Sequence, residues 1–283
     1  SRFGSRFQSV QGQTHTRTLR KLLMLRLLWV AHVVIPLGAL RVEVTNSALP
    51  KEGHVAILLR GQAFRHGRKS EACQKQQIPA QLNATDSLID KIVAPLERNQ
   101  NTVEFFIVNG NSQEHCPMFE ELLMPKFGKR VAAIRQYESL NQSDSMIAVL
   151  EEFRFARDPQ QYDLILIVRH DDYWKQSISE WPTADFDKFN LFSECGEFKA
   201  CMSDIFFMMP GSRWKGFRDA VGTPRCFDNQ LTHGHYCGRA ILKNIGQDNI
   251  SFITDWRPKS PVGNQIRQKN GVADLSRYQK MMT

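Results

Sequence analysis

Short apolar runs alternate with amphipathic segments through the first two thirds of the chain beyond residue 52. Apolar runs of four to eight residues that are rich in β-branched side chains predict strands buried on both faces. Such runs occupy residues 54–59, 103–108, 130–135, 162–168 and 205–209. Apolar positions at helical spacing predict helices over residues 87–96, 118–127 and 144–157. This alternation predicts an α/β, Rossmann-like fold, in which helices cover both faces of a mostly parallel sheet.

The pattern is less regular in the segments that follow residue 174. Residues 185–190 are expected to form a loop, residues 213–220 and 230–244 helices, and residues 250–256 a last strand. The pair Thr85-Asp86 supplies capping side chains for the helix expected over residues 87–96. No internal repeat or low-complexity block interrupts this organisation.

The apolar run over residues 162–168 leads directly into four polar residues, Arg169, His170, Asp171 and Asp172. Ligands of open α/β sheets bind at the carboxyl ends of the strands, which is where these side chains are expected. Carboxylate oxygens suit Mg²⁺ or Mn²⁺, and a guanidinium group suits phosphate or carboxylate. Two interpretations stay open: a site for a cation and a phosphorylated substrate, or an Asp-rich turn that closes a core strand.

Other polar residues follow or precede the predicted strands. Arg60-Gly61-Gln62 follows residues 54–59, and Gly61 allows a tight turn and a close approach of the backbone to a ligand. Ser203-Asp204 precedes the strand over 205–209, so Asp204 could reach the same crevice as Asp171. Trp174 and Trp181 are expected to pack in the core rather than to stack on a sugar.

The amino-terminal region has the composition of a targeting segment. Residues 1–42 hold seven of the 37 Lys and Arg residues and none of the 29 Asp and Glu residues, so the rest of the chain is nearly neutral. This distribution argues against a nucleic-acid-binding face on the domain. Residues 22–40 are nearly all apolar and follow basic residues, which predicts a type II signal anchor or a cleaved signal peptide. A mitochondrial transit peptide is the less favoured alternative.

Downstream motifs agree with a lumenal or secreted domain. Three N-glycosylation triplets begin at Asn83, Asn141 and Asn249, in polar contexts that suggest loops. Six cysteines permit disulfides in an oxidising compartment, and the local pairs Cys195/Cys201 and Cys226/Cys237 are the expected ones. The expected organisation is a basic segment 1–21, an apolar segment 22–40, a linker 41–51, a folded domain 52–260 and a polar tail 261–283.

Three short motifs carry a resemblance. Arg169-His170-Asp171-Asp172-Tyr173-Trp174 resembles the R-x-D-x-Y-W signature of a group of GT-A-like glycosyltransferase homologues from plants and algae. The segment 55–65 (VAILLRGQAFR) resembles the first-strand motif of that group, and Ser203-Asp204 resembles its later Asn/Ser-Asp pair. The similarity covers residues 52–260 in order and spacing.

The resemblance implies transfer of a sugar from a nucleotide-sugar donor to a hydroxyl of a glycan or protein acceptor, in the Golgi or endoplasmic reticulum. It implies that Arg60, Gly61 and Arg65 contact the nucleotide and that Arg169 orients the diphosphate or Asp171. Asp171 and Asp204 would be the catalytic residues, with Asp204 as base or polar anchor. Mn²⁺ or Mg²⁺ would be held by Asp171, Asp172 and His235; the chain has Asp-Asp here and not a strict D-x-D, so metal dependence stays open.

Each of these residues could instead have a purely structural role. Arg169 and Asp171 could form an ion pair, and Asp204 could cap a strand. Arg60 and Arg65 could be surface charges, and His233 and His235 could lie in a solvated loop. Two other functions also remain. One is a sulfo- or phosphotransferase, although the chain has no G-x-x-x-x-G-K-[ST] loop. The other is a non-catalytic lumenal protein of the same fold that binds sugars or nucleotides.

Overall fold

The computed structural model describes residues 48–65, 73–110, 116–138, 140, 142–193, 205–222, 238–253 and 262–265. The chain divides into two units, Ser1–Glu43 and Val44–Thr283, and every described residue lies in the second. The predicted apolar segment 22–40 therefore lies outside the described residues. Within the described ranges, no helix has both the length and the apolar character needed to cross a bilayer.

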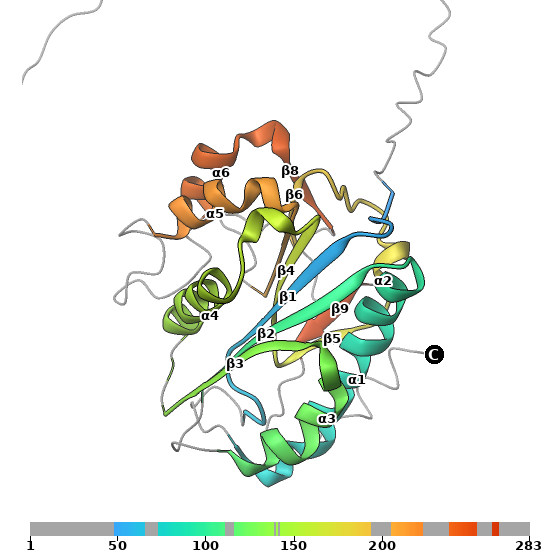
Figure 1. Ribbon diagram of the computed structural model, residues 1–283, viewed down its shortest axis with the longest axis vertical. Coiled ribbons are helices and arrows are strands. Elements are labelled where there is room, and N and C mark those ends of the chain that lie inside the picture. Colours follow the sequence, from blue (N-terminus) through green and yellow to red (C-terminus); the bar gives the residue numbers. More distant parts are fainter. Residues whose placement is uncertain are drawn as a thin grey trace, which may run out of the picture. The chain divides into compact units, whose positions relative to one another are not determined.

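A seven-stranded mixed sheet forms the centre of the described unit, in the order β3-β2-β1-β4-β7-β6-β8 (Figure 1). Its strands are β1 (His54–Arg60), β2 (Thr102–Gly110), β3 (Val131–Tyr137), β4 (Leu164–Arg169), β6 (Phe189–Leu191), β7 (Phe206–Met209) and β8 (Ile250–Phe252). The four strands β3, β2, β1 and β4 are mutually parallel, and β7 runs antiparallel to both β4 and β6. The predicted α/β, mostly parallel architecture is confirmed.

Each face of the sheet carries its own hydrophobic core, because side chains alternate along every strand. Leu59 of β1 and Val168 of β4 point into one core, whereas Leu58 and Ile167 point into the other. The first core is covered by α1 (Ile78–Leu88), the π-helical turns η2 (Ile89–Val93) and η3 (Phe119–Leu123), α2 (Ala94–Arg98) and α3 (Met124–Phe127). The second core is covered by α4 (Gln142–Ala156), α5 (Trp214–Val221) and α6 (Gly238–Ile245) (Figure 1).

The first helix begins nine residues earlier than predicted. α1 starts at Ile78, with Pro79 in its first turn. The helical segment continues through η2 and α2 and ends at Arg98. Its early part was missed because it packs small and polar side chains, such as Ala84 and Thr85, rather than a regular apolar stripe. The expectation that Thr85 and Asp86 cap a helix start is wrong, and the glycosylation triplet at Asn83 lies in this helix and not in a loop.

Residues 185–190 are not simply a loop. Phe189 and Asn190 belong to β6, and the Asn190 side chain closes the preceding turn: its Nδ2 donates to the Asp185 carbonyl at 2.6 Å. The folded part of the chain also extends beyond residue 260. There, β9 (Gly263–Gln265) pairs antiparallel with β5 (Asp172–Trp174), which begins at the second residue of the candidate acidic pair.

Shorter single turns of 3₁₀ helix join these elements. They are η1 (Lys75–Gln77), η4 (Gly128–Arg130), η5 (Pro159–Gln161), η6 (Ile178–Glu180), η7 (Gly211–Arg213) and η9 (Gln247–Asn249). A disulfide joins Cys73, before η1, to Cys116, before η3. It bridges the segments that follow β1 and β2. The predicted pairs Cys195/Cys201 and Cys226/Cys237 lie outside the described residues.

Candidate functional site

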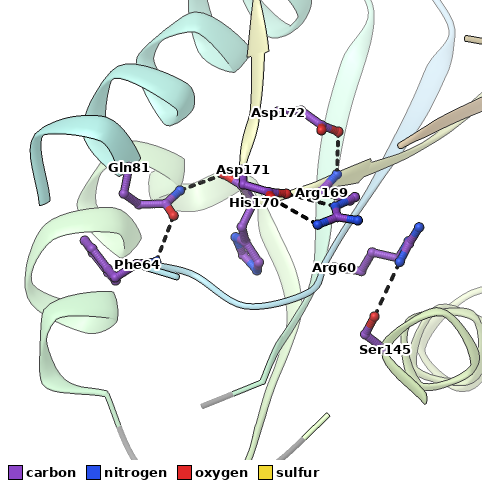
Figure 2. Close-up of polar contacts among 8 residues, drawn as sticks. All are labelled: Arg60, Phe64, Gln81, Ser145, Arg169, His170, Asp171 and Asp172. Carbon is purple, nitrogen blue, oxygen red and sulfur yellow. Dashed lines mark hydrogen bonds and ion pairs between the residues drawn. The ribbon is translucent and has the colours of Figure 1, made fainter. Parts of the chain in front are cut away.

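The carboxyl ends of β1 and β4 lie side by side, and this places the predicted site residues together. Arg60 and Arg169 are register partners at the last positions of the two strands. Both side chains are nearly inaccessible, at 1% and 6% relative exposure. Arg60 turns towards α4, where its Nη1 lies 3.4 Å from the Ser145 hydroxyl oxygen (Figure 2). Gly61, the next residue, has a φ of +103°, which confirms the predicted tight turn after β1.

Arg169 and Asp171 form a two-bonded ion pair (Figure 2). Arg169 Nε donates to Asp171 Oδ1 at 2.8 Å, and Nη2 donates to Oδ2 at 3.0 Å. The Asp171 side chain is only 12% exposed, so water competes weakly with these bonds. The fork of the guanidinium group therefore fixes the plane of the carboxylate.

Asp172 is a different kind of carboxyl group. Its Oδ2 accepts a hydrogen bond from the Arg169 backbone N–H at 2.9 Å, and its Oδ1 is buried with no hydrogen-bond partner. Burial, and secondly the charge of Asp171, raise the pKa of Asp172 well above its ordinary value, although Arg169 and Arg60 oppose that change. These surroundings favour the neutral acid.

His170 points away from the acidic pair and into the core. Its ring is edge-on to Phe119, with the ring centroids 5.6 Å apart, and Nε2 lies 3.4 Å from the Val108 carbonyl oxygen. Burial lowers the pKa of His170 to about 4, against the opposing effects of the Val108 carbonyl and Asp171. His170 is therefore a neutral packing residue and does not serve as a ligand or base at this edge.

Gln81 of α1 joins the two loops that form the site. Its Nε2 donates to the His170 carbonyl at 2.8 Å, and its Oε1 accepts from the Phe64 backbone N–H at 2.9 Å (Figure 2). The segment after β1 is also tied to the end of β2, because the Ala63 N–H donates to Asn109 Oδ1 at 2.9 Å. Both loops are therefore held by buried polar contacts.

A small hollow of about 10 Å³ opens between these segments, with room for about one water molecule. Asp171 lines it from the turn after β4, Phe64 and Arg65 line it from the loop after β1, and the remaining lining comes from η1 and α1. The remaining residues are Gln77, Ala80, Gln81 and Ala84. Asp171 and Arg65 thus share one hollow, as the sequence pattern predicted for the ends of these two strands.

The predicted site residues are distributed as follows. Arg60, Gly61, Arg65, Arg169, Asp171 and Asp172 all belong to the same edge of the sheet. Asp204 and His235 lie outside the described residues. Phe206, two residues after Asp204, pairs with Val168 of β4, so β7 begins at the edge where β4 ends.

The described residues do not fit a divalent cation. Both oxygens of Asp171 are occupied by Arg169, and the surroundings of Asp172 favour its protonated form. Across the described part of the chain, no three His, Cys, Asp or Glu side chains cluster closely enough to hold a metal ion. Metal binding by Asp171, Asp172 and His235 stays a prediction.

Two aromatic residues near the site pack as predicted. The Trp174 and Trp181 rings stack on each other with their centroids 5.5 Å apart, and both are buried, at 2% and 4% exposure.

Gln81 was missed by the sequence analysis, because glutamine within a helix carries no local signal of contacts 17 and 89 residues away.

Comparison with known proteins adds no family to this description: no family model matches the chain, and a search of curated proteins also finds no match. Fold and geometry define the class on their own. The chain contains an α/β domain with a Rossmann-like arrangement, and a buried cluster of arginines and aspartates closes the carboxyl ends of two of its parallel strands.

Proposed function

We propose that this chain is a glycosyltransferase-like protein of the GT-A-like type, which transfers a sugar from a nucleotide-sugar donor to a hydroxyl of a glycan or protein acceptor. The observation that supports it most is the shared hollow of Asp171 and Arg65 at the carboxyl edge of β1 and β4. In open α/β sheets this edge is where nucleotides bind.

The charge of the cluster suits a nucleoside diphosphate. Arg60, Arg65 and Arg169 bring three positive charges, and Asp171 brings one negative charge. Asp172 adds little negative charge because its raised pKa favours the neutral acid. These five side chains therefore carry a net positive charge, which attracts a diphosphate and stabilises the charge that it gains on leaving the sugar.

The side chains have separate roles in this proposal. Arg65 and Asp171 are the side chains that would meet the ligand, because both line the hollow, which admits a group no larger than about one water molecule. Arg169 holds the Asp171 carboxylate in place by its two hydrogen bonds. Gly61 provides the turn that brings Arg65 back towards β4. Asp204 is proposed as the acceptor-activating base or a polar anchor, and this role depends on the sequence motif alone.

The proposed location is the lumen of the Golgi or endoplasmic reticulum, with residues 22–40 as a membrane anchor, or outside the cell if that segment is cleaved. The disulfide between Cys73 and Cys116 supports an oxidising compartment.

A non-catalytic binding protein is the second candidate. It is favoured by the ion pair, since both Asp171 oxygens already accept hydrogen bonds from Arg169 and no carboxylate of this pair is poised as a base. A binding protein would use the same positive cluster to hold the nucleotide.

Donor hydrolysis and binding assays separate the two. Purified protein is incubated with a panel of nucleotide sugars, with and without Mn²⁺, and binding of the matching nucleoside diphosphate is measured by calorimetry. Asp171→Asn tests the carboxylate with little change in shape, and Asp90→Ala is the control because Asp90 is exposed on the outer side of the helical segment.

Turnover by the wild type and by Asp90→Ala, lost in Asp171→Asn, supports the transferase. Nucleotide binding without turnover in all three proteins supports the binding protein. The absence of both binding and turnover in the folded wild type would refute the proposed site. A requirement for Mn²⁺ would show that turnover depends on a cation, without identifying the residues that hold it.

A further inference from the structure

Two of the three N-glycosylation triplets lie within the described residues. Asn83-Ala84-Thr85 lies in the middle of α1, and Asn249-Ile250-Ser251 spans the end of η9 and the start of β8. The motif at Asn141 lies outside the described residues at its first position. The two described asparagines have different environments, and this difference decides which of them a folded domain can carry as a glycosylated residue.

Asn83 lies on the solvent-facing stripe of its helix. Asn83, Asp86 and Asp90 are all exposed, and their spacing of three and four residues places them on one side of the helical segment. The Asn83 side chain makes no hydrogen bond to any residue that the structure describes. A sugar on its Nδ2 would extend into solvent and would displace no contact.

Asn249 is used by the fold. Its Oδ1 accepts a hydrogen bond from Arg213 Nη2 at 2.7 Å, and its Nδ2 donates to the Ile245 carbonyl at 2.9 Å. Ser251, the third residue of the motif, donates its hydroxyl to the Thr183 carbonyl at 2.8 Å. A sugar on Nδ2 would have to fit between η9 and α6, where the partly buried bond to the Ile245 carbonyl now lies.

We propose that Asn83 is an N-glycan acceptor of this protein and that Asn249 is unmodified in the folded domain. Thr85 is only 3% exposed, so a transferase must read the motif before α1 packs onto the sheet. The donor is a lipid-linked oligosaccharide diphosphate of the secretory pathway. Asn83 Nδ2 forms a C–N bond to the first sugar, the bond from that sugar to the diphosphate breaks, the lipid diphosphate leaves, and the amide proton passes to a base of the transferase.

The inference depends on the lumenal location in the proposed function and is independent of catalysis at the Asp171 site. The test therefore uses a chain in which a cleavable secretion signal replaces residues 1–40, expressed in eukaryotic cells, so that the unit Val44–Thr283 enters the lumen whether or not residues 22–40 act as an anchor. Secreted, folded protein is treated with peptide N-glycosidase in heavy-oxygen water, which labels each formerly glycosylated asparagine, and is mapped by mass spectrometry.

The expected result is label at Asn83 and none at Asn249. Asn83→Gln should lose the label at that site and keep the wild-type urea midpoint, because the side chain makes no described contact. Thr85→Ser keeps the hydroxyl and the motif, so it should keep the glycan. The proposal is overturned if Asn83 is unlabelled in the secreted wild type, or if Asn249 is labelled in protein with native urea stability. Neither result would bear on sugar transfer at the Asp171 site.

Discussion

The buried His170 should make the domain sensitive to acid in a way that one substitution removes. An exposed histidine gains a proton as the pH falls below about 6.5. Burial in the core lowers the pKa of His170 to about 4 in the folded chain. Between these two pKa values, His170 is protonated in the unfolded chain but not in the folded chain. The free energy of unfolding must therefore decrease as the pH falls.

The size of this effect follows from the two pKa values. Each pH unit between 6.5 and about 4 removes about 1.36 kcal/mol, so the loss reaches about 3 kcal/mol by pH 4. Asp172 acts in the opposite direction over part of the same range. Its raised pKa means that the folded chain binds a proton more readily than the unfolded chain, so its contribution becomes more favourable as the pH falls. A comparison of variants is therefore needed to separate the contribution of His170 to the pH dependence of stability from that of Asp172.

The suitable variant is His170→Gln, whose amide can still donate to the Val108 carbonyl but does not titrate. Urea unfolding, followed by tryptophan fluorescence, gives the free energy of unfolding at several pH values from about 7 to about 4. His54→Gln is the control, because His54 is exposed at the start of β1. We expect the wild type and the control to lose about 3 kcal/mol more than His170→Gln over this range.

Parallel curves for the wild type and His170→Gln would refute the reasoning. They would mean that His170 is protonated in the folded domain, and hence that water or an anionic group reaches the ring. The absolute stability of His170→Gln at pH 7 does not enter this comparison, since only the change with pH is used.

Three further substitutions test how the site and its supports are held. Gln81→Leu breaks the buried bonds to Phe64 and His170 and should lower the free energy of unfolding by about 2–4 kcal/mol, whereas Gln76→Leu, at an exposed position, should change it little. Gly211→Ala would place a Cβ 2.6 Å from the Pro159 carbonyl oxygen and closer still to that of Tyr162. It should therefore lower the free energy of unfolding, measured in urea, by several kcal/mol. Gly222→Ala, whose new Cβ would lie 3.3 Å from its nearest neighbouring atom, is the matched control. Cys73→Ser opens a 43-residue loop and should lower stability by about 2–4 kcal/mol in non-reducing buffer. A dithiol should then destabilise the wild type more than the variant, and an equal response of the two proteins to the dithiol would contradict this.

The sequence pattern predicts the strands well because each is a continuous apolar run buried on both faces. Residues 54–59 and 162–168 correspond to β1 and β4, and their parallel pairing follows from the helices between them. The meeting of Asp171 and the loop after β1 follows from that pairing alone. The local hydrophobic pattern is therefore sufficient to predict a strand wherever both of its faces are buried.

The pattern fails where polar groups or short elements depend on distant partners. The Gln81 side chain bonds to main-chain atoms, which leave no mark on the residue types around them. The strand β6 has three residues and gains its identity from its neighbours β7 and β8. The use of both Asp171 oxygens by Arg169 is likewise a matter of side-chain direction, so the sequence left both an ion pair and a metal site open where the fold forms the ion pair.

The pairing of β9 with β5 has a consequence for the order of assembly. Asp172–Trp174 lies against residues about ninety positions later in the chain, and Val262, just before β9, is fully buried beside the first core. During synthesis from the amino terminus, β5, which begins at Asp172, therefore lacks its partner strand until Gly263–Gln265 has emerged from the ribosome. A nascent chain that stops short of residue 262 would lack the partner strand of β5, so Asp172 would lie on an unpaired strand.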